Sequence, residues 1–235
     1  MNILTIDFET YYSADLGFAK QTTEEYIRDA RFEVIGVAVQ INDGEPIWFS
    51  GGREDMHQFL NQFDWVNSLA LAHNAMFDGA ILNWVYGIRP KGWLDTLSMG
   101  RALHGTEVGG SLKVLASYYD VGIKGTEVED AKGLKRQDFT AEHLATYGEY
   151  CKNDVKLTYS LFLHMSNSFP AAELRLIDLT LRMFTEPTLE LDGDLLDEHL
   201  LHVQSTKIKL LAHYDKDDLM SNQKFASLLQ VHGIE

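Results

Sequence analysis

Two carboxylates stand two residues apart near the start of the chain, in the sequence DFET at residues 7–10. Residues 2–9 alternate between apolar and polar side chains as a strand does, which places Asp7 and Glu9 on the same strand face. Two like charges so close together repel each other unless a cation lies between them. The pair therefore indicates a cation site at a strand end, although two solvated acids are the simpler interpretation of an isolated D-x-E.

Two further segments carry side chains of the same chemical kind. The sequence HNAMFD follows an apolar stretch and opens a helical pattern, so Asn74 and Asp78 lie within its first turns. The sequence YCKND lies inside a long helical pattern, and its spacing places Tyr150 and Asp154 on one helix face. Each has a structural alternative, because Asn74 can cap its helix, Asp78 suits the helix dipole, and Tyr-Asp pairs on helices are common.

Together the three segments resemble the motifs of the DnaQ-like exonucleases of the DEDD superfamily. That family has D-x-E, N-x-x-x-D and Y-x-x-x-D motifs, and this chain has DFE, NAMFD and YCKND in the same order. Tyr150 stands four residues before Asp154, and Glu149 rather than a histidine stands five before it. The subtype resembled is therefore the one named DEDDy.

The resemblance implies a fold, a reaction and a set of ligands. The fold would be α/β, with an RNase H-like mixed five-stranded sheet flanked by helices and a C-terminal helical extension. The reaction would be release of nucleoside monophosphates from the 3′ ends of single-stranded DNA. Two Mg²⁺ or Mn²⁺ ions would be held by four acids, and a phenol would complete the catalytic set by orienting the attacking water. These residues are Asp7, Glu9, Asp78, Asp154 and Tyr150.

The likeness extends beyond the motifs. Residues 25–34 and 220–226 resemble segments of phage-type family A DNA polymerases, which suggests a proofreading exonuclease with a polymerase domain or subunit as its partner. No polymerase motif is present, so synthesis is not assigned. Two alternatives stay open: an exoribonuclease of the RNase D-like type, and a non-catalytic scaffold fragment associated with a polymerase.

Several neighbours of the acids are candidates for DNA contacts. Thr10 and Asn74 can offer donors to the substrate, and Phe77 can stack on a terminal base or belong to the core. His73 is interpreted as a hydrogen-bonded histidine at a strand end, and Asp95 as a helix cap. The remaining candidates are basic residues of a predicted loop at 121–138, where a solvated loop is the simpler interpretation and contact with the DNA backbone the alternative: Lys124, Lys132, Lys135 and Arg136.

The elements that must position these side chains follow from periodicity and turn signals. Strands are expected over 2–9, 32–41, 45–49 and 68–72, with an Asn-Asp-Gly turn joining the second and third. Helices are expected over 54–63, 75–86, 95–103, 111–119, 140–165, 171–185, 194–214 and 222–232. An exonuclease domain over 1–169 and a helical extension over 170–235 follow from the break before Pro170.

Composition limits the class of protein. A hydrophobic content of 45% is typical of a globular chain, and no apolar run reaches the length of a membrane span, so no membrane partner is expected. The lone Cys151 and the lack of a signal peptide favour the cytoplasm, or the host cytoplasm for a phage protein. The net charge of −15 argues against duplex binding, but not against a grip on a few nucleotides through metal ions and stacking.

Overall fold

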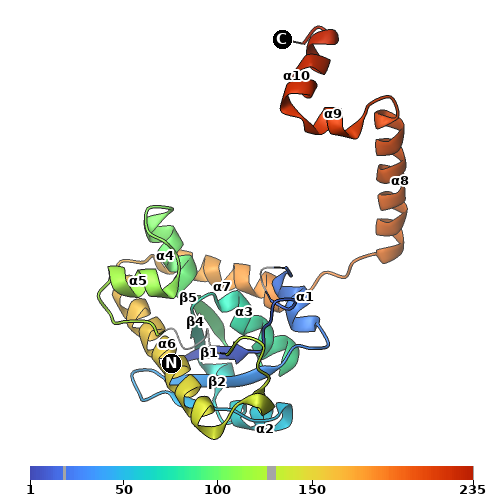
Figure 1. The fold of residues 1–235 in the computed structure, drawn as a ribbon. Coiled ribbons are helices and arrows are strands. Elements are labelled where there is room, and N and C mark those ends of the chain that lie inside the picture. The colour runs from blue at the N-terminus through green and yellow to red at the C-terminus, as the bar shows by residue number, and fades with distance from the viewer. Residues whose placement is uncertain (18–19, 126–130, 235) are drawn as a thin grey trace. The chain divides into compact units, whose positions relative to one another are not determined.

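The computed structural model describes residues 1–17, 20–125 and 131–234, and the chain divides into two compact units, Met1–Pro187 and Thr188–Glu235 (Figure 1). The first unit is built on a five-stranded sheet with the strand order β3-β2-β1-β4-β5. Its strands are β1 (Ile3–Thr10), β2 (Val34–Ile41), β3 (Ile47–Phe49), β4 (Leu69–Ala72) and β5 (Gly92–Asp95). The predicted α/β class with a mixed five-stranded sheet flanked by helices is confirmed.

The sheet combines an antiparallel half with a parallel half. Strands β1, β2 and β3 pair antiparallel, as predicted, and Asn42 adopts a positive φ of 51° in the turn of the hairpin. Strands β4 and β5 run parallel to β1. Periodicity does not predict β5, which begins between the helices expected over 75–86 and 95–103. All four residues of β5 are buried, so the strand has no alternation of polar and apolar side chains to detect.

Helices cover both faces of the sheet. The expected helix over 75–86 is α3 followed by a π-helical segment, and α1 was not predicted although Thr22 and Glu25 form its capping box. Residues 126–130 of the predicted 121–138 loop lie outside the described residues. The helical elements are α1 (Thr23–Arg28), α2 (Arg53–Leu60), η1 (Trp65–Asn67), α3 (Ala75–Ala80), η2 (Ile81–Val85), α4 (Thr96–His104), α5 (Leu112–Tyr118), η4 (Arg136–Asp138), α6 (Ala141–Ser166) and α7 (Ala171–Thr185).

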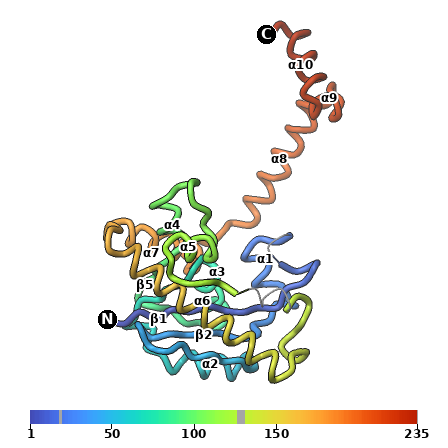
Figure 2. Tube along the Cα trace, turned by 60° about the vertical axis from the view of Figure 1, so that its left-hand side comes forward, coloured from blue at the N-terminus to red at the C-terminus, as the bar shows by residue number. Residues whose placement is uncertain are grey.

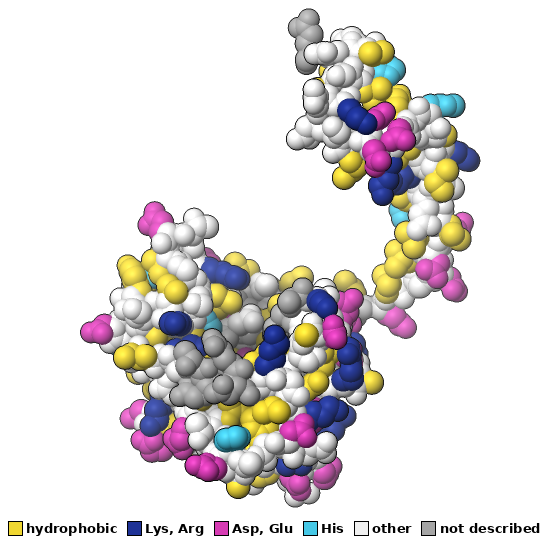
Figure 3. Space-filling view, in the orientation of Figure 1, with side chains coloured by type: hydrophobic (Ala, Val, Ile, Leu, Met, Phe, Trp, Pro, Cys, Tyr) yellow, Lys and Arg dark blue, Asp and Glu magenta, His cyan; other side chains and the backbone are white. Residues whose placement is uncertain are grey.

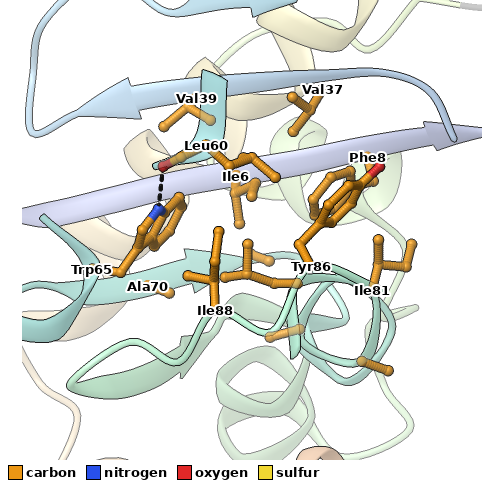
Figure 4. Close-up of a cluster of buried hydrophobic side chains, with 14 of the residues drawn as sticks. Ile6, Phe8, Val37, Val39, Leu60, Trp65, Ala70, Ile81, Tyr86 and Ile88 are labelled. Atoms are coloured by element: carbon orange, nitrogen blue, oxygen red, sulfur yellow. Dashed lines mark hydrogen bonds between the residues drawn. The ribbon is translucent and has the colours of Figure 1, made fainter. Parts of the chain in front are cut away.

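The larger core lies between one face of the sheet and α2, α3 and η2. Ile6 and Phe8 from β1 and Val37 and Val39 from β2 point into it, as the alternation in β1 predicts (Figure 4). Trp65 closes one end, where its indole N–H donates to the carbonyl of Leu60 at 2.8 Å. This face anchors β1, and the opposite face of the same strand is left for the acids.

Helix α6 crosses the opposite face of the sheet, as Figures 1 and 2 both show. It approaches the sheet closely where the Trp48 side chain of β3 lies against Gly36 and Gly148. Cys151 and Val155, one and two turns further along α6, are fully buried with Trp48 and Ala38 of β2. This contact fixes the rotation of α6, which aims its buried polar residues at the end of β1.

The first compact unit extends past residue 169, the expected end of the exonuclease domain. Helix α7 packs on β5 and α3, and the Asp178 carboxylate accepts from the backbone N–H of Trp93 at 2.7 Å. The carbonyl of Thr185 also accepts from the side chains of Asn83 and Trp84. These contacts join α7 to the first unit, so the compact unit continues to Pro187.

The second unit consists of α8 (Gly193–Leu211), α9 (Lys216–Met220) and α10 (Asn222–Val231). Helices α9 and α10 contact each other. Helix α8 has no buried residue, and its exposed apolar side chains are visible as yellow groups in Figure 3. Among the described residues, no helix is both long enough and apolar enough to cross a bilayer.

The close approach at Gly148 generates a test of how α6 is positioned. A methyl group at residue 148 would lie 2.5 Å from Cδ1 of Trp48, so the ring or the helix must move. We expect Gly148→Ala to lower the free energy of unfolding by about 1–3 kcal/mol, the usual cost of overpacking. Thermal or urea unfolding measures this. Gly193→Ala is the matched control, because a methyl group there meets no atom within 4 Å. Equal stability of both variants would contradict the proposed packing.

Candidate active site

The site begins where β1 and β4 separate. Their parallel ladder pairs Ile3 to Thr5 with residues of β4 and then ends, which leaves the later N–H groups of β1 on that edge without a strand partner. The Asp78 carboxylate of α3 takes up one of them, accepting from the backbone N–H of Phe8 at 3.0 Å. Asp78 is 3% exposed. The end of the ladder therefore explains why a carboxylate from α3 lies beside the Asp7–Glu9 segment.

Asp95 holds the turn that leads into α3. Its carboxylate accepts from the backbone N–H groups of Asn74 at 2.8 Å and Ala75 at 3.2 Å, and it also caps α4 through Leu97 and Ser98. The predicted cap at Asp95 is confirmed. Asn74 adopts a left-handed conformation and its side chain makes no capping hydrogen bond, so the alternative of an Asn74 cap is wrong. The neighbouring carboxylate already satisfies the N–H groups that an Asn cap would serve.

The structure brings the four predicted acids together. Glu9, Asp78 and Asp154 are buried and Asp7 is half-buried. Burial, followed by the charge of Asp154, raises the pKa of Asp7 to about 7. Burial and the charge of Asp7 raise the pKa of Glu9 to about 8, and the same two causes raise the pKa of Asp78. Asp78 accepts from the backbone between Asp7 and Glu9, and Asp7 and Asp154 line one cavity, so the three motifs converge on one place.

Helix α6 supplies the other wall of the cluster. The Tyr147 hydroxyl donates to Glu9 Oε2 at 2.6 Å, and the Cys151 thiol lies 3.3 Å from Asp7 Oδ2. Tyr150 is 6% exposed, and burial followed by the charges of Asp154, Glu9 and Asp7 raises the pKa of its phenol. Tyr150 therefore stays protonated and can act as a hydrogen-bond donor. Spacing along the helix predicted this face correctly, with Asp154 one turn beyond Tyr150.

A lysine from the loop after α5 also enters the cluster. The Lys124 ammonium pairs with Asp154 Oδ2 and lies 4.6 Å from the centre of the Tyr150 ring. Its positive charge opposes the rise in the pKa of Asp7 and Glu9. The sequence suggested that Lys124 belongs to a solvated loop, but its ammonium group lies among the acids and offsets their negative charge.

Two cavities open on either side of the acids. One, about 480 Å³ in volume, is lined by Asp7 and Asp154 together with Asn74, Lys124 and Arg101. The other, also about 480 Å³, is lined by Glu9 with Thr10, Phe77, Tyr12 and Lys132. The three predicted substrate contacts are therefore divided, with Asn74 in the first cavity and the other two in the second.

The individual environments refine those three assignments. The Thr10 hydroxyl accepts from the Tyr26 hydroxyl at 2.8 Å. The Phe77 ring stacks on the Tyr26 ring, with 6.1 Å between the ring centres, and packs against the larger core. It also lines the cavity that contains Glu9, so Phe77 is both a core residue and a candidate for stacking on a base. His73 has a partner on each ring nitrogen, Thr96 Oγ1 at 2.8 Å and the Gly110 carbonyl at 3.0 Å, which confirms it as a hydrogen-bonded histidine.

Sequence reasoning missed three polar contacts of the cluster: those of Tyr147, Cys151 and Lys124. Tyr147 and Cys151 lie on the same α6 stripe as the third motif, so helical spacing from Asp154 could have indicated them. Lys124 precedes Asp154 by 30 residues and lies in a loop, where no periodicity gives a signal. Only the folded chain shows that its ammonium reaches the acids.

The sequence matches a known protein family. Residues 22–169, more than half of the chain, match the family described as 3′-5′ exonuclease. The chain belongs to this family of 3′-5′ exonucleases. The matched region contains the second and third motifs, and the first motif precedes it on β1. No curated protein matches the sequence significantly.

Solved structures share the fold of this exonuclease. Brucella melitensis NrnC is 17% identical, with a TM-score of 0.55 over 78% of this chain and 81% of NrnC. Trypanosoma brucei RNase D in complex with RNA U12 is 14% identical, with a TM-score of 0.59 over 81% of this chain and 67% of that chain. The family B DNA polymerase of Pyrobaculum calidifontis is 16% identical, with a TM-score of 0.54 over 78% and 27%. At these identities the likeness shows the RNase H-like fold.

The side chains of the cluster suit a hard divalent cation. Carboxylate oxygens of Asp7 and Glu9 lie within 4.8 Å of one another and of the Cys151 sulfur. Oxygen ligands of this kind are those that Mg²⁺ and Mn²⁺ prefer. The exonuclease family depends on divalent metal ions, and one NrnC structure contains bound Mg²⁺. The raised pKa values also fit, because a cation would remove the repulsion that causes part of the shift.

These raised pKa values make the stability of the metal-free exonuclease depend on pH. The folded state holds Asp7 at about 7 and Glu9 at about 8, against ordinary values of 3.8 and 4.5. It therefore binds more protons than the unfolded state between about pH 4 and pH 8, so the free energy of unfolding contributed by these groups falls as the pH rises through that window.

We expect Asp7→Asn to be more stable than the unchanged protein in EDTA at about pH 8, by on the order of 1–3 kcal/mol, because it removes one buried charge. Near pH 5 the difference should shrink, since the carboxyl group is then protonated. Mg²⁺ should stabilise the unchanged protein more at pH 8 than at pH 5 and stabilise Asp7→Asn less. Thermal unfolding measures all three. A variant that is less stable at both pH values would contradict the electrostatic account.

Proposed function

We propose that this exonuclease removes nucleoside monophosphates from the 3′ ends of single-stranded DNA, using two Mg²⁺ or Mn²⁺ ions held by Asp7, Glu9, Asp78 and Asp154. The observation that carries the proposal is the meeting of four carboxyl groups from β1, α3 and α6 in one buried corner, with a cavity on either side. A purely structural role does not explain such a cluster, because carboxyl groups buried next to one another repel when ionised and so destabilise a fold.

The ions would neutralise the scissile phosphate and lower the pKa of the attacking water. The protein contributes orientation. Tyr150 stays protonated, so its hydroxyl can donate to the water or to a phosphate oxygen but cannot act as a base near neutral pH. Tyr147 fixes the rotamer of Glu9 through its 2.6 Å hydrogen bond. Asn74 on one side and Phe77 on the other line the cavities that would receive the phosphate and base of the last nucleotide.

RNA is the competing substrate. Two structural neighbours support this alternative, since one NrnC structure contains pGG and the RNase D structure contains RNA U12. The polymerase neighbour supports the DNA assignment. We keep DNA as the proposal, with proofreading for a polymerase domain or subunit as its biological setting and the cytoplasm as its location. An exoribonuclease or a polymerase-associated scaffold would retain the fold and differ in substrate or in activity.

Release of mononucleotides from 3′-labelled single-stranded DNA tests the proposal. We expect cleavage from the 3′ end that requires Mg²⁺ or Mn²⁺ and stops in EDTA. Asp7→Ala should lower kcat at least about a thousandfold, because bound metal ions stabilise the transition state by several kcal/mol. Tyr150→Phe should lower kcat by a smaller factor, about a hundredfold, since it removes one orienting hydrogen bond. Gln58→Ala, at an exposed position of α2, is the control. Undiminished cleavage by Asp7→Ala would overturn the assignment.

Matched DNA and RNA oligonucleotides of one sequence separate the two substrates. The proposal predicts a higher kcat/KM on DNA. A higher value on RNA would replace it with the exoribonuclease alternative, and no cleavage of either would favour the scaffold.

A further inference from the structure

A third cavity, of different chemistry, lies in the first unit. It has a volume of about 540 Å³ and is lined by the guanidinium-bearing residues Arg28, Arg53 and Arg136, with Trp84 and Phe32 among its apolar walls. The three arginines come from α1, α2 and η4, so the fold gathers them from distant parts of the chain. The chain has a net charge of −15, so a cavity with three guanidinium groups differs in charge from the protein as a whole.

The arginines are held in place without being neutralised as a set. Arg28 pairs with Glu24 at 2.9 Å, and its guanidinium lies 4.9 Å from the centre of the Trp84 ring. Arg53 donates to the carbonyl of Val85 at 3.0 Å. Within the described ranges, neither Arg53 nor Arg136 forms an ion pair with a carboxylate.

Two acids also line this cavity, and both are engaged. Asp29 is bound by Arg31 at 2.7 Å, and Glu33 accepts from the backbone N–H of Arg136 at 3.1 Å. The Arg31 partner offsets the charge of Asp29. The arginine cavity therefore keeps a positive balance and suits a ligand that carries anionic groups.

A basic segment joins this cavity to the acids. Lys132 lines the cavity that contains Glu9, and Arg136 lines the arginine cavity. Between them, the Lys135 ammonium lies 5.6 Å from the centre of the Tyr11 ring. The segment is anchored to the end of β1, because the N–H of Gly133 donates to the carbonyl of Tyr12 at 2.8 Å.

On the face drawn in Figure 3, Lys and Arg side chains gather on the part of the first unit around α1. The end of β1 also reaches this region, since the N–H of Tyr11 donates to the carbonyl of Glu33, which lines the arginine cavity. The acids at residues 7 and 9 and the arginine cavity are thus neighbours along one strand end.

We propose that the arginine cavity is a second nucleic-acid site, which binds the phosphates of the single strand several nucleotides 5′ of the scissile bond. The strand leaves the acids, passes Lys132 and Lys135, and places a phosphate among Arg28, Arg53 and Arg136. Phosphate contacts of this kind hold the register of a strand without reading its sequence. The proposal rests on the nuclease function proposed above and adds a preference for substrates longer than two or three nucleotides.

The length dependence of KM tests this site. We expect the KM of the unchanged exonuclease to fall as the single strand lengthens from a dinucleotide to roughly twelve nucleotides. The double variant Arg53→Ala and Arg136→Ala should raise KM on the long substrate at least about tenfold with little change in kcat, because two charge-assisted hydrogen bonds are lost. The slope of log KM against log salt should also decrease by about 0.7 for each phosphate contact removed.

Two controls make the result decisive. Arg175→Ala on α7 removes one guanidinium group from an exposed position outside the cavity, and it should leave KM unchanged. The double variant Arg53→Lys and Arg136→Lys keeps the charge and should show an intermediate KM, with an unfolding temperature equal to that of the unchanged protein. A KM that does not depend on length, or arginine variants that match Arg175→Ala, would overturn the second site. An inactive unchanged protein would instead overturn the proposed function.

Discussion

The repulsion among buried carboxyl groups is the constraint on which the rest of this structure depends. Asp7, Glu9 and Asp78 share a corner from which water is largely excluded, and the charge of Asp7 adds to burial in raising the pKa of both Glu9 and Asp78. A fold accepts such an arrangement only if something else holds the groups in place. Here the ladder between β1 and β4 ends early, Asp95 fixes the turn into α3, and close packing at Gly148 fixes α6. The larger core on the other face of β1 supplies the stability that the acid cluster lacks.

Positive charge enters the corner in a form that can be exchanged. Lys124 pairs with Asp154 from a loop rather than from the sheet or a long helix, so its ammonium can leave without disturbing the scaffold. A divalent cation would also offset the negative charge of the acids, with twice the charge of an ammonium group, and it would bind the oxygen ligands that it prefers. If the proposed ions bind, the protein would be most stable in the metal-bound state, because a ligand that binds only the folded state stabilises it.

Local spacing predicted which motif side chains share a face, because the motifs are short and lie on regular elements. The D-x-E pair on β1 and the Tyr150–Asp154 pair on α6 need only the periods of a strand and a helix. Prediction failed where tertiary contacts decide. The fully buried β5 has no alternation, Asn74 does not cap because Asp95 reaches its N–H group, and Lys124 acts across 30 residues of chain. Packing likewise shows that α7 joins the first compact unit, which periodicity alone does not reveal.

The central claim is that carboxylates from three distant segments jointly bind divalent cations. An anomalous difference map from crystals soaked in Mn²⁺ tests it most directly. The account predicts at least one strong peak in contact with the carboxylates of Asp7 and either Glu9 or Asp154, with the Lys124 ammonium displaced from Asp154. Crystals that show Mn²⁺ bound only at other acidic residues, with the Lys124–Asp154 pair intact, would contradict it.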